Sequence, residues 1–170
     1  VVVSSTGNLG VSTAAYAASA GMECLFVAGE SVEEAVLDQA RAFGSRVAVV
    51  DPVTYRLAAE HLASKGSWFP VGLFMPWSVS HPFGIEGYRT FAFELIEELG
   101  GAPAAVLFPC ARGNGLYGTW KGFVEAKDWG WVSELPRMVA CQPIGADSLA
   151  LSLAKGTDHV VELSPTSSIA

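Results

Sequence analysis

The sequence predicts an α/β fold in which helices cover both faces of a mostly parallel β-sheet, giving three layers. Two observations lead to this prediction. Short apolar runs without polar alternation recur along the chain, as in strands that are buried on both faces. Helical segments that end at glycines follow most of these runs, and such alternation is typical of right-handed βαβ crossovers.

The first strand leads into a turn that is suited to a ligand. Val1–Val3 is wholly β-branched, the letters SSTGNLG follow it, and an Ala-rich helix is expected over Val11–Ala20, ending at Gly21. In open parallel sheets ligands bind at the carboxyl ends of the strands, where the first N–H groups of a helix attract anions. An ordinary capped strand–helix connection is the alternative. Gly7 and Gly10 lack the third glycine of a dinucleotide fingerprint, which disfavours a nicotinamide nucleotide.

The pattern repeats through the first half of the chain, which we assign to a small α/β domain over residues 1–80. The prolines of the last strand favour an edge position in the sheet. The expected elements are a strand at 23–29, a helix from a capping box of Ser31 and Glu34 to Gly44, a strand at 46–50, a helix capped by Asp51 and ended by Gly66, and a strand at 68–76.

We assign residues 81–170 to part of a larger α/β domain, in which a second glycine-rich turn, Cys110–Gly118, follows a buried strand. Such a turn at the start of a helix can surround a phosphate with backbone N–H groups, and the helix dipole favours the dianion. A plain turn is the alternative. The remaining expected elements are a helix at 85–99, a strand at 104–109, a helix bearing Trp120 and Phe123, a strand at 137–142, a helix at 147–154 and a strand at 159–163.

The composition limits the classes of function. A net charge of −7 without a basic run argues against nucleic acid as a partner. The longest apolar run, Trp68–Trp77, is broken by prolines and is too short to cross a bilayer, so we expect no membrane span. Cys24, Cys110 and Cys141 form no CxxC pair, which favours a cytoplasmic location and disfavours a bound metal.

The chain is unusually apolar for its length of 170 residues. Hydrophobic residues make up 51% and charged residues 16%, whereas about 25% charged is ordinary. We therefore expect a core shared with polypeptide outside this sequence, or a large subunit interface such as that of a homodimer. The start within an apolar run, without Met, favours a central fragment of a longer protein.

Several segments together resemble one enzyme family. The letters SSTGNLGVSTAAYAASAG resemble the cofactor turn of threonine synthases, which belong to the tryptophan-synthase β-subunit (fold-type II) group of pyridoxal-phosphate enzymes. The letters PCARGNGLYGTWKGF resemble the family's phosphate loop, PVGNGGNLxGxxxGF, and HPFGIEGYRTFAFEL resembles its NPxRIxGQKTxxxEI segment, which crosses between the domains. The resemblance implies a fold-type II fold, pyridoxal 5'-phosphate as cofactor, and carbon–oxygen lyase chemistry that converts O-phosphohomoserine to threonine.

The resemblance also implies roles for individual residues. Asn8 would bond the phenolic oxygen of the pyridoxal ring, and the substrate carboxylate would bind at Ser5, Thr6 and Gly7. Arg112 either adds a charged hydrogen bond to the cofactor phosphate or faces solvent. We expect the two turns to face one another across a cleft, since they would contact opposite ends of one cofactor. The residues expected at the cofactor phosphate are Arg112, Gly113, Asn114, Gly115 and Leu116.

The sequence departs from the family at informative positions. The family's Asn and Arg of the crossing segment are His81 and Gly84 here, and that arginine helps to hold a phosphorylated substrate. The family's catalytic lysine stands upstream in a segment like SFKDR, so we expect it outside this chain, which would be inactive alone. None of the lysines present has that context: Lys65, Lys121, Lys127 and Lys155.

Other functions stay open at this point. Within the enzymes, the alternatives are a serine/threonine dehydratase and a diaminopropionate-type ammonia-lyase. From another class comes a non-catalytic α/β binding or interaction module that has kept the shape of the family. The apolar composition fits this last alternative as well.

Overall fold

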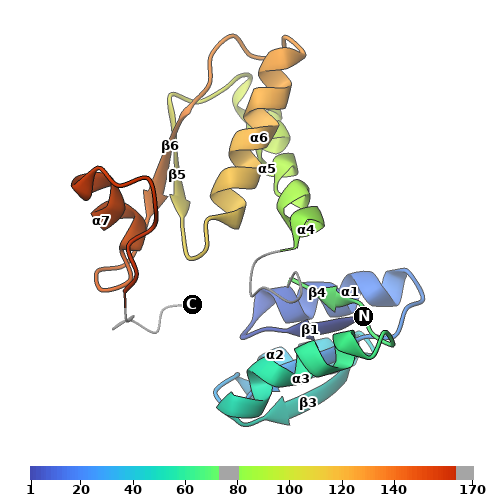
Figure 1. Ribbon diagram of the computed structural model, residues 1–170. Coiled ribbons are helices and arrows are strands. Elements are labelled where there is room, and N and C mark those ends of the chain that lie inside the picture. The colour runs from blue at the N-terminus through green and yellow to red at the C-terminus, as the bar shows by residue number, and fades with distance from the viewer. Residues whose placement is uncertain (73–80, 164–170) are drawn as a thin grey trace. The chain divides into compact units, whose positions relative to one another are not determined.

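A computed structural model describes residues 1–72 and 81–163 of the chain (Figure 1). The chain divides into two compact units, Val1–Gly84 and Ile85–Ala170. In the described residues no helix is long and apolar enough to cross a membrane.

The first unit is built on a sheet of four parallel strands in the order β3-β2-β1-β4. Val2 of β1 pairs with Leu25 of β2 and with Pro70 of β4, and Leu25 pairs with Arg46 of β3. β4 is short and lies at an edge, as the prolines of its segment predict, whereas the expected residues 73–76 lie outside the described part. The strands are β1 (Val2–Ser4), β2 (Leu25–Gly29), β3 (Arg46–Val50) and β4 (Pro70–Val71).

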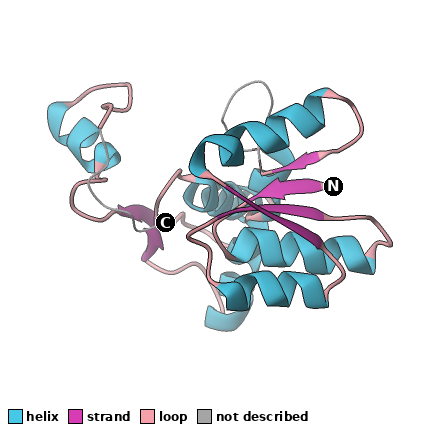
Figure 2. Ribbon diagram, turned by 90° about the horizontal axis from the view of Figure 1, so that it is seen from below, coloured by secondary structure: helices cyan, strands magenta, loops and turns pink. Residues whose placement is uncertain are grey.

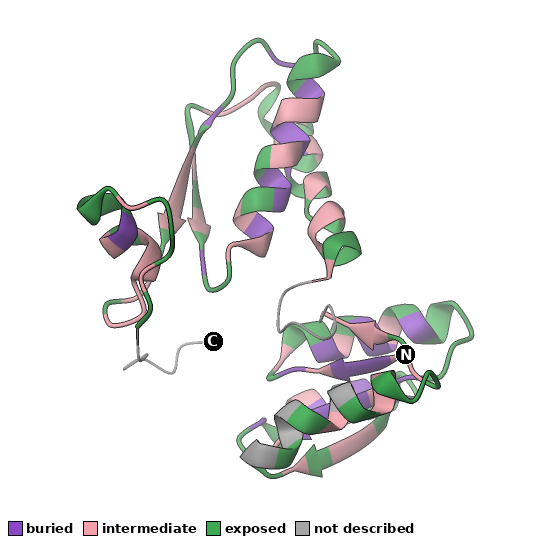
Figure 3. Ribbon diagram, in the orientation of Figure 1, coloured by how far each residue is buried: buried purple, intermediate pink, exposed green. Residues whose placement is uncertain are grey.

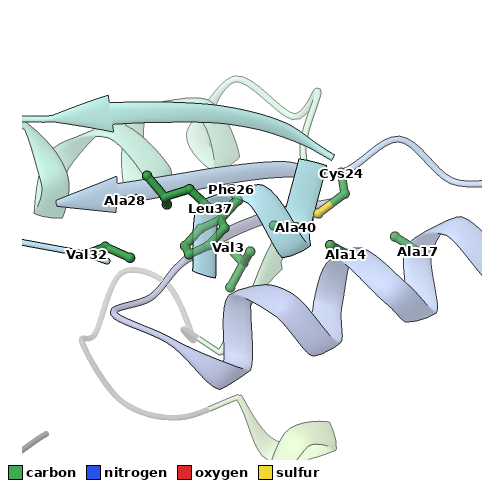
Figure 4. Packing of buried hydrophobic residues seen from close by; sticks show 9 residues of the cluster. All are labelled: Val3, Ala14, Ala17, Cys24, Phe26, Ala28, Val32, Leu37 and Ala40. Carbon is green, nitrogen blue, oxygen red and sulfur yellow. The ribbon is translucent and has the colours of Figure 1, made fainter. Parts of the chain in front are cut away.

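Three helices cover the two faces of this sheet (Figure 2). Val3 and Phe26 point into a core with α1 and α2 (Figure 4), whereas Val2 and Val27 point into a second core with α3. This alternation of neighbouring strand residues is the reason why the strands are apolar throughout. The three-layer α/β prediction is thus confirmed. The helices are α1 (Asn8–Ser19), α2 (Glu34–Ala42) and α3 (Pro52–Ser64).

Helix α1 lies unusually close to the sheet. A Cβ atom added to Gly10 would fall 2.4 Å from Cζ of Phe26, whose side chain is fully buried. Any larger residue at this position would push the start of α1 away from β2. The second glycine of the first turn therefore serves packing, since it lets the start of α1 lie against β2.

The second unit contains two parallel strands and four helices among its described residues. Pairing runs from Ala105 with Arg137 to Pro109 with Cys141, and α6 packs against α5 and against both strands. Figure 3 shows the buried positions along α6. The elements are α4 (Pro82–Gly87, which begins in the first unit), α5 (Arg89–Leu99), β5 (Ala105–Pro109), α6 (Asn114–Asp128), β6 (Arg137–Cys141) and α7 (Ser148–Lys155).

Glycines also let α6 approach its neighbours closely. A Cβ atom on Gly118 would lie 2.4 Å from the carbonyl oxygen of Ile85, and one on Gly122 would lie 2.4 Å from that of Arg89. Gly118 contacts Ile85, and four residues further along α6 Gly122 contacts Arg89, four residues further along the neighbouring segment. α5 and α6 therefore run in the same direction. The two helices therefore touch through their backbones.

Three predicted elements were wrong in detail. The capping box of Ser31 and Glu34 does not form, because Val32 is buried in the core and the helix begins only at Glu34. The helix expected over 85–99 is interrupted at Tyr88, between α4 and α5. Residues 159–163 form no strand, since the N–H of Val161 donates to Ser152 Oγ of α7 (2.8 Å) instead of to a neighbouring strand.

The close contact at Gly122 predicts a large effect of a single methyl group. Gly122→Ala should lower the free energy of unfolding by about 1 to 3 kcal/mol, because the contacted atom is backbone and cannot turn aside. Gly87→Ala is the matched control, since nothing lies within 4 Å of its added Cβ and its φ is ordinary. Urea unfolding of both variants tests this, and equal stability of the two would contradict the packing argument.

Candidate functional site

The first turn lies at the carboxyl end of β1, in the interior of the four-stranded sheet. Ser5 is buried, and its Oγ accepts the N–H of Gly7 at 3.1 Å, so this hydroxyl shapes the turn. Thr6 and Asn8 are exposed. The N-cap of α1 is Gly7, and no side chain caps the helix. The polar side chains of Thr6 and Asn8 therefore surround a helix start that is open to a ligand.

Ser4 belongs to the same edge of the sheet but was missed in the sequence analysis. Its Oγ is buried and has no hydrogen-bond partner among the described residues. A buried hydroxyl without a partner costs about 1 to 3 kcal/mol, so such an atom at a strand end indicates a missing partner. The sequence feature that could have identified Ser4 is its position at the end of an apolar strand, two residues after Val2, so that both side chains point to the same face of the sheet.

The second turn connects β5 to α6. Gly113 is the N-cap of α6 and has a φ of 81°, a left-handed conformation that favours glycine. No side chain caps this helix either, and Asn114 is its first residue. A helix of 15 residues presents its full dipole at this end, so its first N–H groups are suited to a dianion.

The residues predicted at the phosphate differ in their surroundings. Gly115 is buried, and a Cβ atom there would lie 2.5 Å from Phe108 of β5, which explains this glycine by packing. Asn114 and Leu116 are half-buried. Arg112 is exposed and forms no ion pair within the described part of the chain.

Cys110 forms the inner wall of this turn. Its thiol is buried, and its N–H donates to the carbonyl oxygen of Cys141 at 2.9 Å. Burial raises the pKa of the Cys110 thiol, against a smaller opposing effect of a hydrogen bond with the backbone of Gly113. The thiol therefore stays protonated near neutral pH, which makes Cys110 a packing residue and not a nucleophile.

The lysines of the chain are not placed like a catalytic amine. Lys121 forms an ion pair with Glu86 and lies 5.9 Å from the centre of the Tyr117 ring. A lysine that acts as a nucleophile is usually desolvated or set beside another cation. The remaining three are exposed: Lys65, Lys127 and Lys155.

His81 is occupied by local contacts in the crossing segment. Its Nδ1 accepts the N–H of Phe83 at 3.3 Å, and its ring lies 5.2 Å from that of Phe69 and 5.0 Å from that of Phe83. These contacts hold the imidazole against the two phenyl rings, where the family has an asparagine.

Charged groups fix the crossing segment to α6. Arg89 binds Glu125 of α6 at 2.9 Å and Glu86 at 3.1 Å, and Lys121 of α6 completes the chain of ion pairs with Glu86. These pairs join the same helices that meet at Gly118 and Gly122. Helix α6 is thus held by both packing and charge.

Comparison with known proteins identifies the family. The family model described as pyridoxal-phosphate dependent enzyme matches residues 1–170. The chain belongs to this family. The resemblance to pyridoxal-phosphate enzymes and the cofactor pyridoxal 5'-phosphate are thereby confirmed.

Among curated proteins, this family member is similar to threonine synthases. It is 34% identical to the threonine synthase of Mycobacterium tuberculosis (strain H37Rv) over 152 residues, which are 89% of this chain and 41% of that protein. It is 30% identical to the threonine synthase of Methanocaldococcus jannaschii over 166 residues, 92% of this chain and 38% of that protein. The chain thus spans about two fifths of the length of these relatives.

Solved structures show the same fold. The diaminopropionate ammonia lyase of Escherichia coli matches with a TM-score of 0.74 and 22% identity, over 99% of this chain and 43% of that chain. Threonine deaminase isoform 2 of Solanum lycopersicum matches with a TM-score of 0.77 and 23% identity, over 97% of this chain and 45% of that chain. The prediction of a fold-type II architecture is confirmed.

The residues present fit this cofactor. Each glycine-rich turn leads into a helix whose N-cap is a glycine and which has no side-chain cap. The first backbone N–H groups of each helix are therefore left for a phosphate or a carboxylate. The orphaned hydroxyl of Ser4 lies at the end of the strand that leads into the first turn. Each turn separately has the donors that one end of pyridoxal phosphate and its substrate would need.

The ion pairs of α6 predict a titration that can be measured. The hydrogen bond from Lys121 lowers the pKa of Glu86 below its ordinary value of 4.5, with smaller charge effects of Lys121 and Arg89, against a raising effect of burial. The pKa of Glu86 is thus lower in the folded state than in the unfolded state. The ion pair therefore stabilises the fold above about pH 4.5, and this stabilisation is lost as the pH falls through the folded pKa.

The test is a carboxyl titration by NMR in the wild type and in Lys121→Met. The pKa of Glu86 should rise in Lys121→Met, and the free energy of unfolding should fall less steeply as the pH is lowered. Lys127→Met, an exposed residue of the same helix, is the control. An unchanged Glu86 pKa in Lys121→Met would contradict the interaction.

Proposed function

We propose that the intact protein is a pyridoxal-phosphate-dependent carbon–oxygen lyase of threonine-synthase-like type, acting on a small amino acid. The observation that carries this proposal is helix α6, which follows the parallel strand β5, has a glycine as its N-cap and has no side-chain cap. The identity of 34% to a threonine synthase supports the choice among family members. The chain 1–170 would then supply most of the binding groups and not the whole catalytic apparatus.

In this proposal α6 holds the phosphate of the cofactor. The N–H groups from Gly113 to Leu116 lie at a helix start that has no side-chain cap and would bind the phosphate, and the left-handed conformation of Gly113 sets the course of the loop that leads into the helix. Asn8, at the start of α1, contacts the oxygen on the pyridoxal ring.

The first turn would orient the substrate. The Thr6 hydroxyl and the backbone of Gly7 receive the substrate carboxylate, whereas Ser5 holds the turn in shape through its bond to Gly7. Pyridoxal phosphate, when bound, supplies an electron sink that stabilises negative charge at the substrate α-carbon. A fixed carboxylate orients the bond that is broken at this carbon, which is how the turn would contribute to rate.

We propose that the lysine that binds the cofactor and moves protons belongs to a part of the protein outside this chain. Lys121 is paired with Glu86, and the other lysines are exposed, so none of those present has a suitable setting. The length of the threonine synthases, of which this chain spans about two fifths, leaves room for such a residue.

The substrate is inferred from two departures of the crossing segment from the family's sequence. Gly84 stands where threonine synthases have an arginine, and the family's asparagine is His81, whose Nδ1 accepts the N–H of Phe83. A phosphorylated substrate brings a dianion that needs a charge-assisted bond. We infer that O-phosphohomoserine is handled poorly and that an unphosphorylated amino acid is preferred, as for a serine/threonine dehydratase or a diaminopropionate-type lyase.

Two further properties belong to the proposal. Free cysteines, two of them buried, favour a reducing compartment and hence the cytoplasm.

Exposed apolar side chains such as Leu107, which is 68% exposed, favour further burial in the intact protein, including a homodimer interface. Light scattering of the intact protein measures the oligomeric state.

A kinetic comparison tests the substrate. The intact protein should show a higher kcat/KM for L-serine or L-threonine than for O-phosphohomoserine. Arg112→Ala should leave this order unchanged, because Arg112 is exposed beside the proposed cofactor phosphate. A preference for O-phosphohomoserine that survives in Arg112→Ala would favour a plain threonine synthase. No lyase activity on any of these substrates would favour the non-catalytic binding module.

The role of Asn8 has its own test. Asn8→Ala should weaken binding of pyridoxal phosphate about tenfold, which corresponds to one hydrogen bond in a ligand site. Ser12→Ala is the control, since Ser12 is exposed on the same helix and its Oγ bonds only the Leu9 carbonyl oxygen among the described residues. Equal dissociation constants for the two variants would contradict the contact of Asn8 with the cofactor.

A further inference from the structure

Tyr88 lies along the first turns of α6. A Cβ atom built on Gly118 would fall 2.5 Å from Cβ of Tyr88, and one built on Gly115 would fall 3.4 Å from Cε1 of the same ring. The side chain therefore starts beside Gly118 and runs beside Gly115. It follows the helix toward its N-terminus.

The hydroxyl group is the far end of this side chain. Since Cε1 already lies beside Gly115, the oxygen at the tip of the ring extends further toward Gly113, the N-cap of α6. The distance along the helix from Gly115 to Gly113 is only about 3 Å at 1.5 Å per residue. The ring therefore directs the hydroxyl toward the helix end that we propose for the cofactor phosphate.

The ring is held in this direction by its neighbours. It stacks on Phe91 with ring centres 6.0 Å apart, and Phe91 meets Phe108 of β5 edge-on at 6.1 Å. The carbonyl oxygen of Tyr88 accepts a hydrogen bond from the buried hydroxyl of Thr119 at 3.4 Å. Since Gly115 and Gly118 carry no side chains, they provide the space that the ring occupies.

The polar tip of Tyr88 is available for a ligand. The residue is 38% exposed, and its hydroxyl makes no hydrogen bond to any residue that the structure describes. A tyrosine that served packing alone would need no hydroxyl at this position. The direction of the ring and the open helix start together indicate a function for that group.

We propose that the Tyr88 hydroxyl donates a hydrogen bond to the phosphate monoester bound at the start of α6, and that it thereby sets the affinity for the phosphorylated cofactor. This inference rests on the proposed function, in which α6 holds that phosphate. Tyr88 is a binding residue in this account, additional to the backbone donors from Gly113 to Leu116. Its donor replaces some of the hydrogen bonds that the phosphate loses with water.

The test uses the intact protein and measures dissociation constants by equilibrium dialysis for pyridoxal phosphate and for pyridoxal, which lacks the phosphate. Tyr88→Phe should weaken pyridoxal phosphate about tenfold, which corresponds to one charge-assisted hydrogen bond, and leave pyridoxal unchanged. Tyr117→Phe is the matched control, because Tyr117 is on α6, is 52% exposed and stacks on Trp120. Its affinities should equal those of the wild type.

The outcomes separate this inference from the proposed function. If the wild type binds pyridoxal phosphate no more tightly than pyridoxal, the phosphate site at α6 is wrong, and the role of Tyr88 is wrong with it. If the wild type prefers the phosphorylated form and Tyr88→Phe keeps the full preference, only the role of Tyr88 is wrong. An effect of Tyr88→Phe confined to binding of O-phosphohomoserine would assign the phosphate to the substrate, and would also overturn the inference.

The stability of the variant is measured in parallel. Removal of one hydroxyl leaves the ring stack with Phe91 in place, so the urea midpoint of Tyr88→Phe should match the wild type. Tyr88→Leu, which removes the ring, should lower that midpoint. A loss of phosphate preference in Tyr88→Phe with an unchanged midpoint supports direct binding, and a loss only in Tyr88→Leu overturns it.

Discussion

The structure depends on how closely two helices approach their neighbours. At Gly10 the added Cβ would overlap the Phe26 ring, and at Gly118 it would overlap the carbonyl oxygen of Ile85. Close packing of this kind leaves no freedom for the helix starts to shift. The N–H groups at the beginning of α1 and α6 are therefore fixed before a ligand arrives, so binding does not have to order them.

The glycine-rich turns thus contain glycines of two kinds. Gly10, Gly115 and Gly118 are explained by packing, whereas Gly113 is explained by its left-handed φ of 81° at the N-cap. The two kinds act together in α6, because packing at Gly115 and Gly118 places the helix and Gly113 at the N-cap turns the loop. The ion pairs of Glu86 add to this support, since they join α4 and α6 beside the close contact.

The fold was predictable because its signals are local. Apolar strands such as Arg46–Val50 and helix stops such as Gly21 and Gly44 depend on neighbours in the sequence, and the structure has them in place. The capping box failed because burial of Val32, a tertiary effect, delays the helix. The strand at 159–163 failed for a similar reason, since Val161 bonds to Ser152. Of the candidate site, the turns were predictable from motifs. The direction of the Tyr88 ring and the orphaned hydroxyl of Ser4 required coordinates.

The central claim is that the start of α6 is built to bind the phosphate of the cofactor. A crystal structure of the intact protein with pyridoxal phosphate tests it most directly. The account predicts phosphate oxygens within hydrogen-bond distance of the N–H groups from Gly113 to Leu116. A phosphate bound away from the start of α6 would contradict it.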